Sequence, residues 1–191
     1  MRLSFLNRDN ERERLRRAFQ AEHGSFCCVY GRRRCGKSRL LNETLKDVRH
    51  TYYVADERDT ELQRQELATA AAEMMPGFDL VGYPDWSILL QKWWEAAPDG
   101  AVLVIDEFPY LAAVSAELPS LFQKMIDREA ERPVHVVLCG SSQRMMQGLV
   151  LDRDAPLYGR AREIIDVKPI GAKWVMEVFK DYGVPELIES Y

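Results

Sequence analysis

Residues 25–45 read SFCCVYGRRRCGKSRLLNETL, and this stretch decides the fold class. Its first part, 25–30, is a short apolar run of the kind that forms a buried strand. The segment from Gly31 to Ser38 then fits the pattern G-x-x-x-x-G-K-[ST] at every position, and a helix is predicted over 37–45. A strand, a glycine-rich loop and a helix in this order predict one unit of a parallel α/β sheet.

The loop between Gly31 and Ser38 carries residue types suited to a polyphosphate. Glycines allow close backbone approach, and the N–H groups of the loop and of the helix start face an anion. Lys37 can reach the β- and γ-phosphates, and Ser38 can offer a hydroxyl to Mg²⁺. We therefore predict an ATP or ADP site lined by Gly31, Arg32, Arg33, Arg34, Cys35, Gly36, Lys37, Ser38 and Arg39.

Four of these loop residues also have plainer interpretations. Arg32, Arg33 and Arg34 could meet phosphate or a neighbouring subunit, but we favour solvent or pairing within the chain. Cys35 lies where its pKa could fall, yet a small filler is a better hypothesis than a redox switch.

A second motif ends the apolar run 101–105 in the acid pair Asp106 and Glu107. An unbroken apolar strand is typical of a parallel sheet, whose carboxyl edge is where α/β proteins bind ligands. We predict that Asp106 holds Mg²⁺ with Ser38, directly or through water, and that Glu107 polarises the attacking water. The alternative is a merely solvated acid pair.

Two later segments carry further candidates. Ser141 and Ser142 follow the apolar run 134–139, so one hydroxyl could sense the γ-phosphate or position the attacking water while the other caps the next helix. Arg160 precedes the run 163–167 and could stabilise transition-state charge, in its own site or in a neighbour's. The plainer alternative is a surface arginine.

The rest of the chain alternates strands with amphipathic helices. We predict strands over 25–30, 51–54, 101–105, 134–139 and 163–167, and helices over 10–20, 37–45, 61–75, 86–94, 118–126 and 172–182. Thr60 and Asp85 are the expected caps of two helices. Trp86, Trp93 and Trp94 share one helical face, which indicates core packing rather than a base-stacking platform.

The amino-acid composition argues against several classes of protein. The 191 residues are 47% hydrophobic and 29% charged, as in ordinary globular proteins, and the net charge of −4 argues against a basic nucleic-acid binder. Residues 1–50 hold 13 basic and 6 acidic residues, so an anion site is expected near the start. Scattered Cys and His residues indicate neither a disulfide framework nor a zinc site. Without a membrane span or a signal peptide, we expect a cytoplasmic protein.

Five sequence blocks occur in a characteristic order: Phe5-x-Asn7-Arg8-x-x-Glu11, Gly31–Ser38, Val104–Leu111, Cys139–Ser142 and Pro156–Arg160. Together they resemble the archaeal-type ATPase family, within the AAA+/STAND branch of P-loop NTPases. The resemblance implies a three-layer P-loop fold with a parallel five-stranded sheet in the order 5-1-4-3-2. It also implies ATP with Mg²⁺, catalysis by the glutamate after the Walker B aspartate, and Arg8 near the adenine.

Relatives of this kind continue into a helical lid and often into further domains. The chain ends about where the lid should begin, so we expect 1–191 to be a single nucleotide-binding core.

The function predicted is ATP hydrolysis, slow in isolation, with Glu107, Lys37, Arg160 and Ser141 as catalytic residues and Ser38 and Asp106 at the metal. The alternative is a nucleotide-dependent switch with little turnover. A kinase is disfavoured, because no acceptor-site signature accompanies the acid pair. A homo-oligomer or a partner protein is possible; neither nucleic acid nor membrane is indicated.

Overall fold

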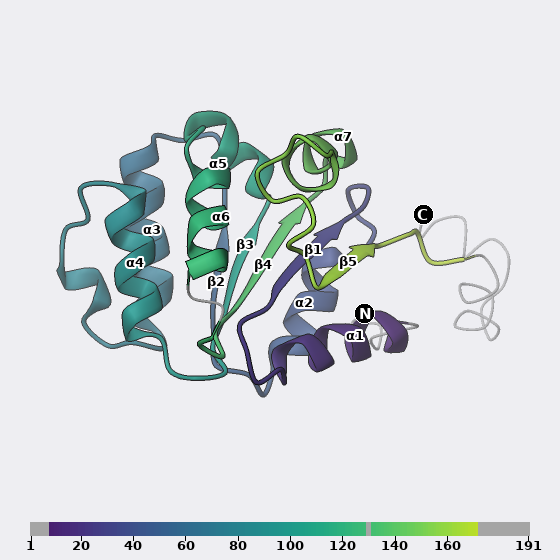
Figure 1. Cartoon of the computed structure of the whole chain (residues 1–191), viewed down its shortest axis with the longest axis horizontal. Coiled ribbons are helices and arrows are strands. Elements are labelled where there is room, and N and C mark those ends of the chain that lie inside the picture. The colour runs from purple at the N-terminus through teal and green to yellow at the C-terminus, as the bar shows by residue number, and fades with distance from the viewer. Residues whose placement is uncertain (1–7, 129–130, 172–191) are drawn as a thin grey trace, which may run out of the picture.

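The computed structural model describes residues 8–128 and 131–171. Within them, five strands form one parallel sheet in the order β2-β3-β4-β1-β5 (Figure 1). This is the predicted order read from the other side, so the P-loop NTPase fold is confirmed. The strands are β1 (Phe26–Tyr30), β2 (His50–Val54), β3 (Val102–Asp106), β4 (His135–Gly140) and β5 (Glu163–Asp166). Phe5, Asn7 and the helix predicted over 172–182 lie outside the described residues.

Two helices cover one face of the sheet. α1 (Asp9–Phe19) and α2 (Lys37–Leu45) pack their leucines against Cys27 and Val29 of β1 and Val104 of β3. Cys28, the next residue of β1, faces the opposite side of the sheet, as the alternation of side chains along a strand requires.

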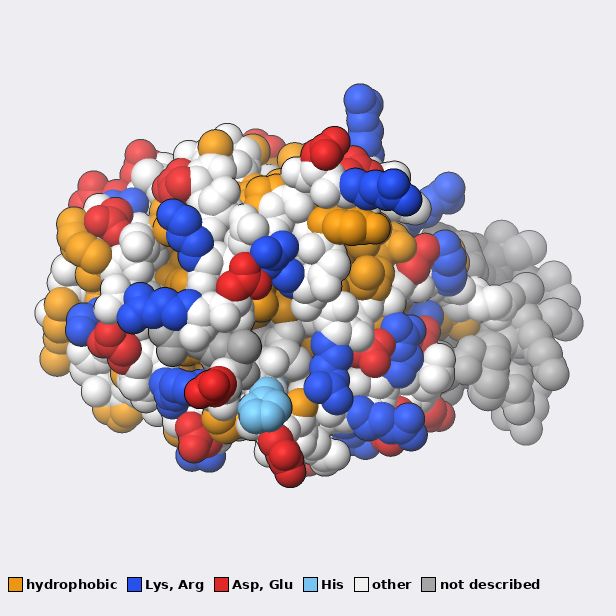
Figure 2. All heavy atoms as spheres, viewed as in Figure 1, with side chains coloured by type: hydrophobic (Ala, Val, Ile, Leu, Met, Phe, Trp, Pro, Cys, Tyr) orange, Lys and Arg blue, Asp and Glu red, His pale blue; other side chains and the backbone are white. Residues whose placement is uncertain are grey.

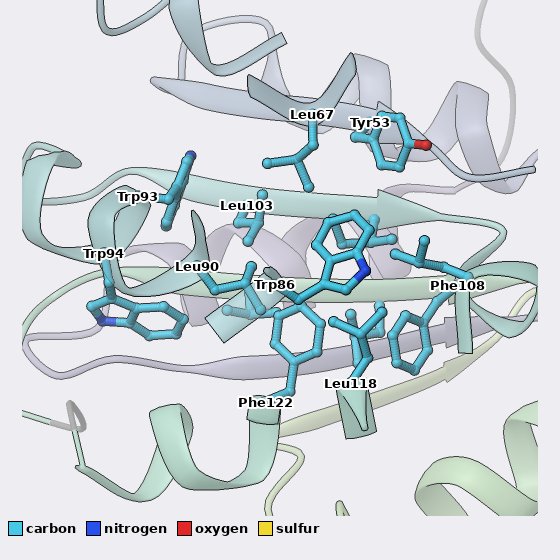
Figure 3. Packing of buried hydrophobic residues seen from close by; sticks show 14 of the residues in the cluster. Tyr53, Leu67, Trp86, Leu90, Trp93, Trp94, Leu103, Phe108, Leu118 and Phe122 are labelled. Carbon is cyan, nitrogen blue, oxygen red and sulfur yellow. The ribbon is translucent and has the colours of Figure 1, made fainter. Parts of the chain in front are cut away.

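The other face carries the larger core. It is covered by α3 (Thr60–Ala72), α4 (Trp86–Ala96), α5 (Phe108–Val114), α6 (Leu118–Arg128) and α7 (Gln143–Met146), with η1 (Phe78–Leu80) and the π-helical η2 (Gln147–Leu151) in the connections. Figure 3 shows Trp86, Phe108 and Phe122 gathered between these elements, and the last two rings meet edge-on at 5.7 Å. Trp86, Trp93 and Trp94 are all buried, so the predicted core role is confirmed.

Helix starts follow local hydrogen bonding. Asp85 caps α4 as predicted, since its carboxylate accepts from the N–H of Ile88. The prediction for Thr60 is wrong: Asp59 caps α3, accepting from Glu61 N. The Thr60 hydroxyl is instead bound to Ser115 and accepts from the Trp86 indole, which fixes α3 against α4 and α5.

Neither α5 nor η2 was predicted from the sequence pattern. α5 begins directly after Glu107 and has Pro109 in its first turn, where the missing N–H of proline does no harm. This short helix matters for the site, because it fixes the chain direction immediately after the acid pair.

Candidate functional site

The glycine-rich loop joins β1 to α2 and depends on two glycines. Gly31 has φ of 149°, and a Cβ there would lie 2.3 Å from the carbonyl oxygen of Val167. Gly36 is the N-cap of α2 and has left-handed angles, with φ of 86°. Neither position accepts another residue without strain or displacement. The sequence requirement for glycine therefore has a steric cause at both ends of the loop.

Lys37 lies across this loop. Its side chain is buried, and Nζ donates to the carbonyl oxygens of Gly31 at 3.0 Å and of Arg32 at 3.2 Å. The cation thus sits inside the ring of backbone that the loop forms. Since an ammonium has three donors, one remains for an anion.

Ser38 and Asp106 are brought together across the sheet edge. Ser38 Oγ donates to Asp106 Oδ2 at 2.6 Å, and the hydroxyl of Tyr52 donates to the same oxygen at 2.7 Å. Burial would raise the pKa of Asp106, but hydrogen bonds from Ser38, Tyr52 and neighbouring groups outweigh it and lower the pKa below its ordinary value. Asp106 is therefore an anion at neutral pH.

Glu107 and Ser141 form the next pair along this edge. Glu107 Oε2 accepts from Ser141 N at 2.9 Å and from Ser141 Oγ at 2.8 Å. Glu107 has left-handed angles, with φ of 54°, a strained conformation that clusters at functional sites. Ser142 caps α7, accepting from Met145 N. The two serines thus have separate contacts, one to the acid and one to the helix.

The loop arginines are exposed. Arg32, Arg33, Arg34 and Arg39 all reach the surface, and Arg33 donates to the hydroxyl of Tyr110 at the start of α5. Arg34 has φ of 64°, which makes it a second strained residue beside the site. These observations agree with pairing inside the chain for Arg33 and leave a role toward phosphate as a prediction.

Arg8 braces the outer side of the loop. Its guanidinium is buried and donates to the carbonyl oxygens of Cys35, at 3.2 Å, and Lys168, and it pairs with Glu11 at 3.0 Å. The contact joins the loop to the chain after β5. Its expected place near an adenine stays a prediction.

The cysteines are buried and free. Cys35 packs into the core between α1, α2 and the sheet, as expected of a filler. Burial raises the pKa of Cys27 and of Cys28 to about 12. Such thiols are inert at neutral pH.

Arg160 lies apart from this cluster. It forms a forked pair with Asp127 of α6, with Nε–Oδ1 and Nη2–Oδ2 distances of 2.8 Å each, and Nη1 donates to the carbonyl of Pro156. The backbone N–H of Arg162 reaches Phe26 at the start of β1, so this segment borders the amino edge of the sheet. The phosphate loop follows the other end of β1.

Sequence reasoning missed Tyr52 and Tyr110. Tyr52 was recognised only as a strand residue, although the expected order places β2 beside β3 and its acid pair. Its position in the neighbouring strand was the available signal. No sequence signal indicated the role of Tyr110, because α5 was not predicted.

The donor set fits Mg²⁺. Ser38 uses its only proton on Asp106, so both hydroxyl lone pairs remain for a cation, and oxygen ligands are what Mg²⁺ prefers. Across 8–128 and 131–171, no group of three His, Cys, Asp or Glu side chains could hold a metal by itself. Nor is any helix in these ranges long and apolar enough to span a membrane.

Comparison with known protein families shows which family the chain belongs to. Residues 5–189 match the model of an ATPase domain found predominantly in Archaea. The chain belongs to this family of ATPase domains. An uncharacterized protein of Methanocaldococcus jannaschii is 30% identical to this ATPase domain over 188 residues, or 98% of the chain. The chain spans 41% of that relative's length.

Solved structures agree on the fold. A Walker-type ATPase of Pyrococcus abyssi superposes with a TM-score of 0.71 at 20% identity, over 97% of the ATPase domain and 62% of that chain. The ORC1 protein of Aeropyrum pernix, in complex with DNA, superposes with a TM-score of 0.68 at 16% identity, over 98% of the ATPase domain and 50% of that chain. A STAND protein of Pyrococcus horikoshii superposes with a TM-score of 0.61 at 16% identity, over 100% of the ATPase domain and 28% of that chain. At such identity the likeness shows the fold alone.

Proposed function

We propose that this ATPase domain binds ATP with Mg²⁺ and hydrolyses it, with Glu107 as the general base. One observation carries the proposal: Lys37, Ser38, Asp106 and Glu107 meet at the carboxyl edge of the sheet, although they come from separate parts of the chain. A cation, a hydroxyl, an ionised carboxylate and a second carboxylate are the groups that phosphoryl transfer to water requires.

Each residue has a distinct role in this proposal. Lys37 and the loop N–H groups bind and orient the phosphates, and Ser38 and Asp106 hold Mg²⁺. The bound cation would neutralise charge that develops on the phosphate oxygens. Glu107 takes up the proton of the attacking water. Ser141, whose N–H and hydroxyl both donate to Glu107, positions that carboxylate for the attacking water.

Arg160 is proposed to act on a neighbour's site. In its own chain it borders the opposite edge of the sheet and is held by Asp127. Acting in trans would require release from that pair. Because an added arginine is worth about 10³–10⁵ in rate when it is in place, the isolated domain should hydrolyse ATP slowly.

A nucleotide-dependent switch is the second candidate. The observation in its favour is that the N–H and the hydroxyl of Ser141 both donate to Glu107. A nucleotide that changes these contacts could alter the conformation of the site without being hydrolysed. Nucleotide binding without phosphate release would support the switch.

The test is phosphate release from ATP by the wild-type domain, with Mg²⁺ or with a chelator, over a range of protein concentrations. We expect slow, Mg²⁺-dependent release whose specific activity rises with concentration. Arg160→Ala and Glu107→Gln proteins, each inactive, should partly restore activity when mixed. Absence of release at every concentration contradicts the hydrolytic proposal, and failure to complement contradicts the trans role of Arg160.

A further inference from the structure

Tyr52 shares the carboxylate of Asp106 with Ser38. The two hydroxyls donate to the same oxygen, Oδ2, at 2.7 and 2.6 Å, while Oδ1 accepts from Glu107 N at 2.9 Å. A carboxylate oxygen has about two acceptor sites, so the two hydroxyls fill Oδ2. The orientation of Asp106 is thereby fixed from both of its oxygens.

The two hydroxyl donors differ in what holds them. Ser38 belongs to the phosphate loop and is itself a candidate metal ligand. Tyr52 belongs to β2, which pairs with β3 along its whole length, with Tyr52 opposite Val104 and Val54 opposite Asp106. Its ring packs against the core on the α1–α2 face. Tyr52 is therefore a donor to Asp106 that is held by the sheet and not by the phosphate loop.

We propose that Tyr52 is a positioning residue that orients the Asp106 carboxylate toward Mg²⁺, an inference that rests on the proposed function. With Tyr52 present, the carboxylate cannot turn when Ser38 engages the cation, since its second hydroxyl donor comes from the sheet. Without the Tyr52 hydroxyl, one acceptor site of Oδ2 loses its donor, and the carboxylate is less firmly oriented. Partners of this kind typically change metal affinity by about 10–100-fold when they are removed.

The chain provides a matched control in the next residue. Tyr53 lies in the same strand, faces the opposite side of the sheet and donates its hydroxyl to Gln63 at 2.9 Å. Tyr53→Phe and Tyr52→Phe each remove one oxygen from one strand. Only the second removes it from the Asp106 carboxylate. A general weakening of β2 would affect both variants, whereas orientation of Asp106 would affect one.

The experiment measures binding and does not depend on turnover. A non-hydrolysable ATP analogue is titrated calorimetrically into wild-type, Tyr52→Phe and Tyr53→Phe proteins, first with chelator and then over a series of Mg²⁺ concentrations. Tyr52→Phe should keep the wild-type affinity in chelator and require about 10-fold more Mg²⁺ for the same gain in affinity. Tyr53→Phe should follow the wild type in Mg²⁺ dependence, even with a lower melting temperature.

Tyr52→Leu, which keeps an apolar side chain against the core and has no donor, is measured alongside and should raise the Mg²⁺ requirement likewise. This second variant covers a failure of Tyr52→Phe to fold. Equal Mg²⁺ requirements in the wild type and a folded Tyr52 variant overturn the positioning role and leave the proposed function standing. A wild-type protein whose nucleotide affinity does not respond to Mg²⁺ overturns both.

Discussion

The carboxyl and amino edges of the same sheet use polar side chains differently. At the carboxyl edge, Lys37 donates to loop carbonyls, Ser38 donates to Asp106, and Glu107 accepts from Ser141, all through contacts that a ligand can replace. At the amino edge, His135 is fully buried and bonded to Ser25, whose hydroxyl donates to the carbonyl of Ala18. That chain of contacts joins β4, β1 and α1, and no described group in it faces an open site.

The parallel topology explains why ligand chemistry and stability depend on opposite edges of the sheet. Parallel strands bring their carboxyl ends to one edge, where loops of different strands meet and ligands bind. Their amino ends follow the helices, and backbone hydrogen bonds such as those of His135 N to Ala101 and of Arg162 N to Phe26 join them. Changes at the carboxyl edge should therefore alter nucleotide chemistry with little loss of stability, and changes to His135 or Ser25 at the amino edge should do the reverse.

Figure 2 shows how charged side chains are distributed on one face of the molecule. On the face shown, Lys and Arg side chains lie interspersed with Asp and Glu side chains and form no single basic field. Charge on this face therefore gives no sign of a nucleic-acid surface.

The largest effect is expected from Glu107→Gln at the carboxyl edge. Loss of the general base should slow hydrolysis by about 10²–10⁴, measured as phosphate release, while ATP stays bound. Glu117→Gln, at an exposed glutamate on the surface, is the control and should hydrolyse ATP at the wild-type rate. A Glu107→Gln protein that turns over normally would place the base elsewhere.

A smaller effect is expected from His135 at the amino edge, in stability rather than catalysis. Burial lowers the pKa of His135 from 6.5 to about 4, so the folded protein resists a proton that the unfolded chain accepts. As the pH falls from about 7 to 4, His135 should remove up to about 3 kcal/mol of unfolding free energy. Denaturant unfolding at a series of pH values measures this.

His135→Gln provides the comparison. It should be less stable at pH 7 but lose less stability on acidification than the wild type, and its affinity for ATP at pH 7 should be unchanged. Parallel pH curves for the two proteins would show that His135 does not carry the acid sensitivity.

The smallest effect on stability and on nucleotide affinity is expected from Arg160→Ala. The pair with Asp127 is a forked but largely exposed contact, which is typically worth less than about 1 kcal/mol. Arg160 holds the pKa of Asp127 below its ordinary value, so this contribution exists at neutral pH and is lost as acid protonates Asp127. Thermal unfolding and ATP binding should both stay close to wild type. A large loss of nucleotide affinity would instead connect Arg160 with the carboxyl edge of its own chain.

Most of the fold could be predicted from the sequence because its signals are local. Apolar runs marked all five strands to within two residues, and the glycine-rich loop fixed the start of α2 at Lys37. The strand order came from the family resemblance rather than from periodicity. α5 escaped prediction because seven residues with a proline give no helical period.

The site was predictable where topology alone brings residues together. Ser38, Asp106 and Ser141 each follow a strand or start a helix at one edge, so their approach needs no further information. The partner of Arg160 could not be predicted in this way, because it lies in a long connection and its contact is set by the nearest acid of α6. The contact of Tyr52 with Asp106 could not be predicted without knowing that a side chain of the neighbouring strand reaches this carboxylate.

Binding of ATP to Lys37→Ala tests whether the carboxyl edge of the sheet is a triphosphate site. Isothermal titration with Mg²⁺ should show about 10–100-fold weaker binding than the wild type, the loss expected for one charge-assisted contact, with an unchanged melting temperature of the free protein. Lys46→Ala, which removes an exposed lysine paired with Glu43 just after the same helix, should bind as the wild type does. Equal ATP affinity in folded Lys37→Ala and wild-type proteins would contradict the account.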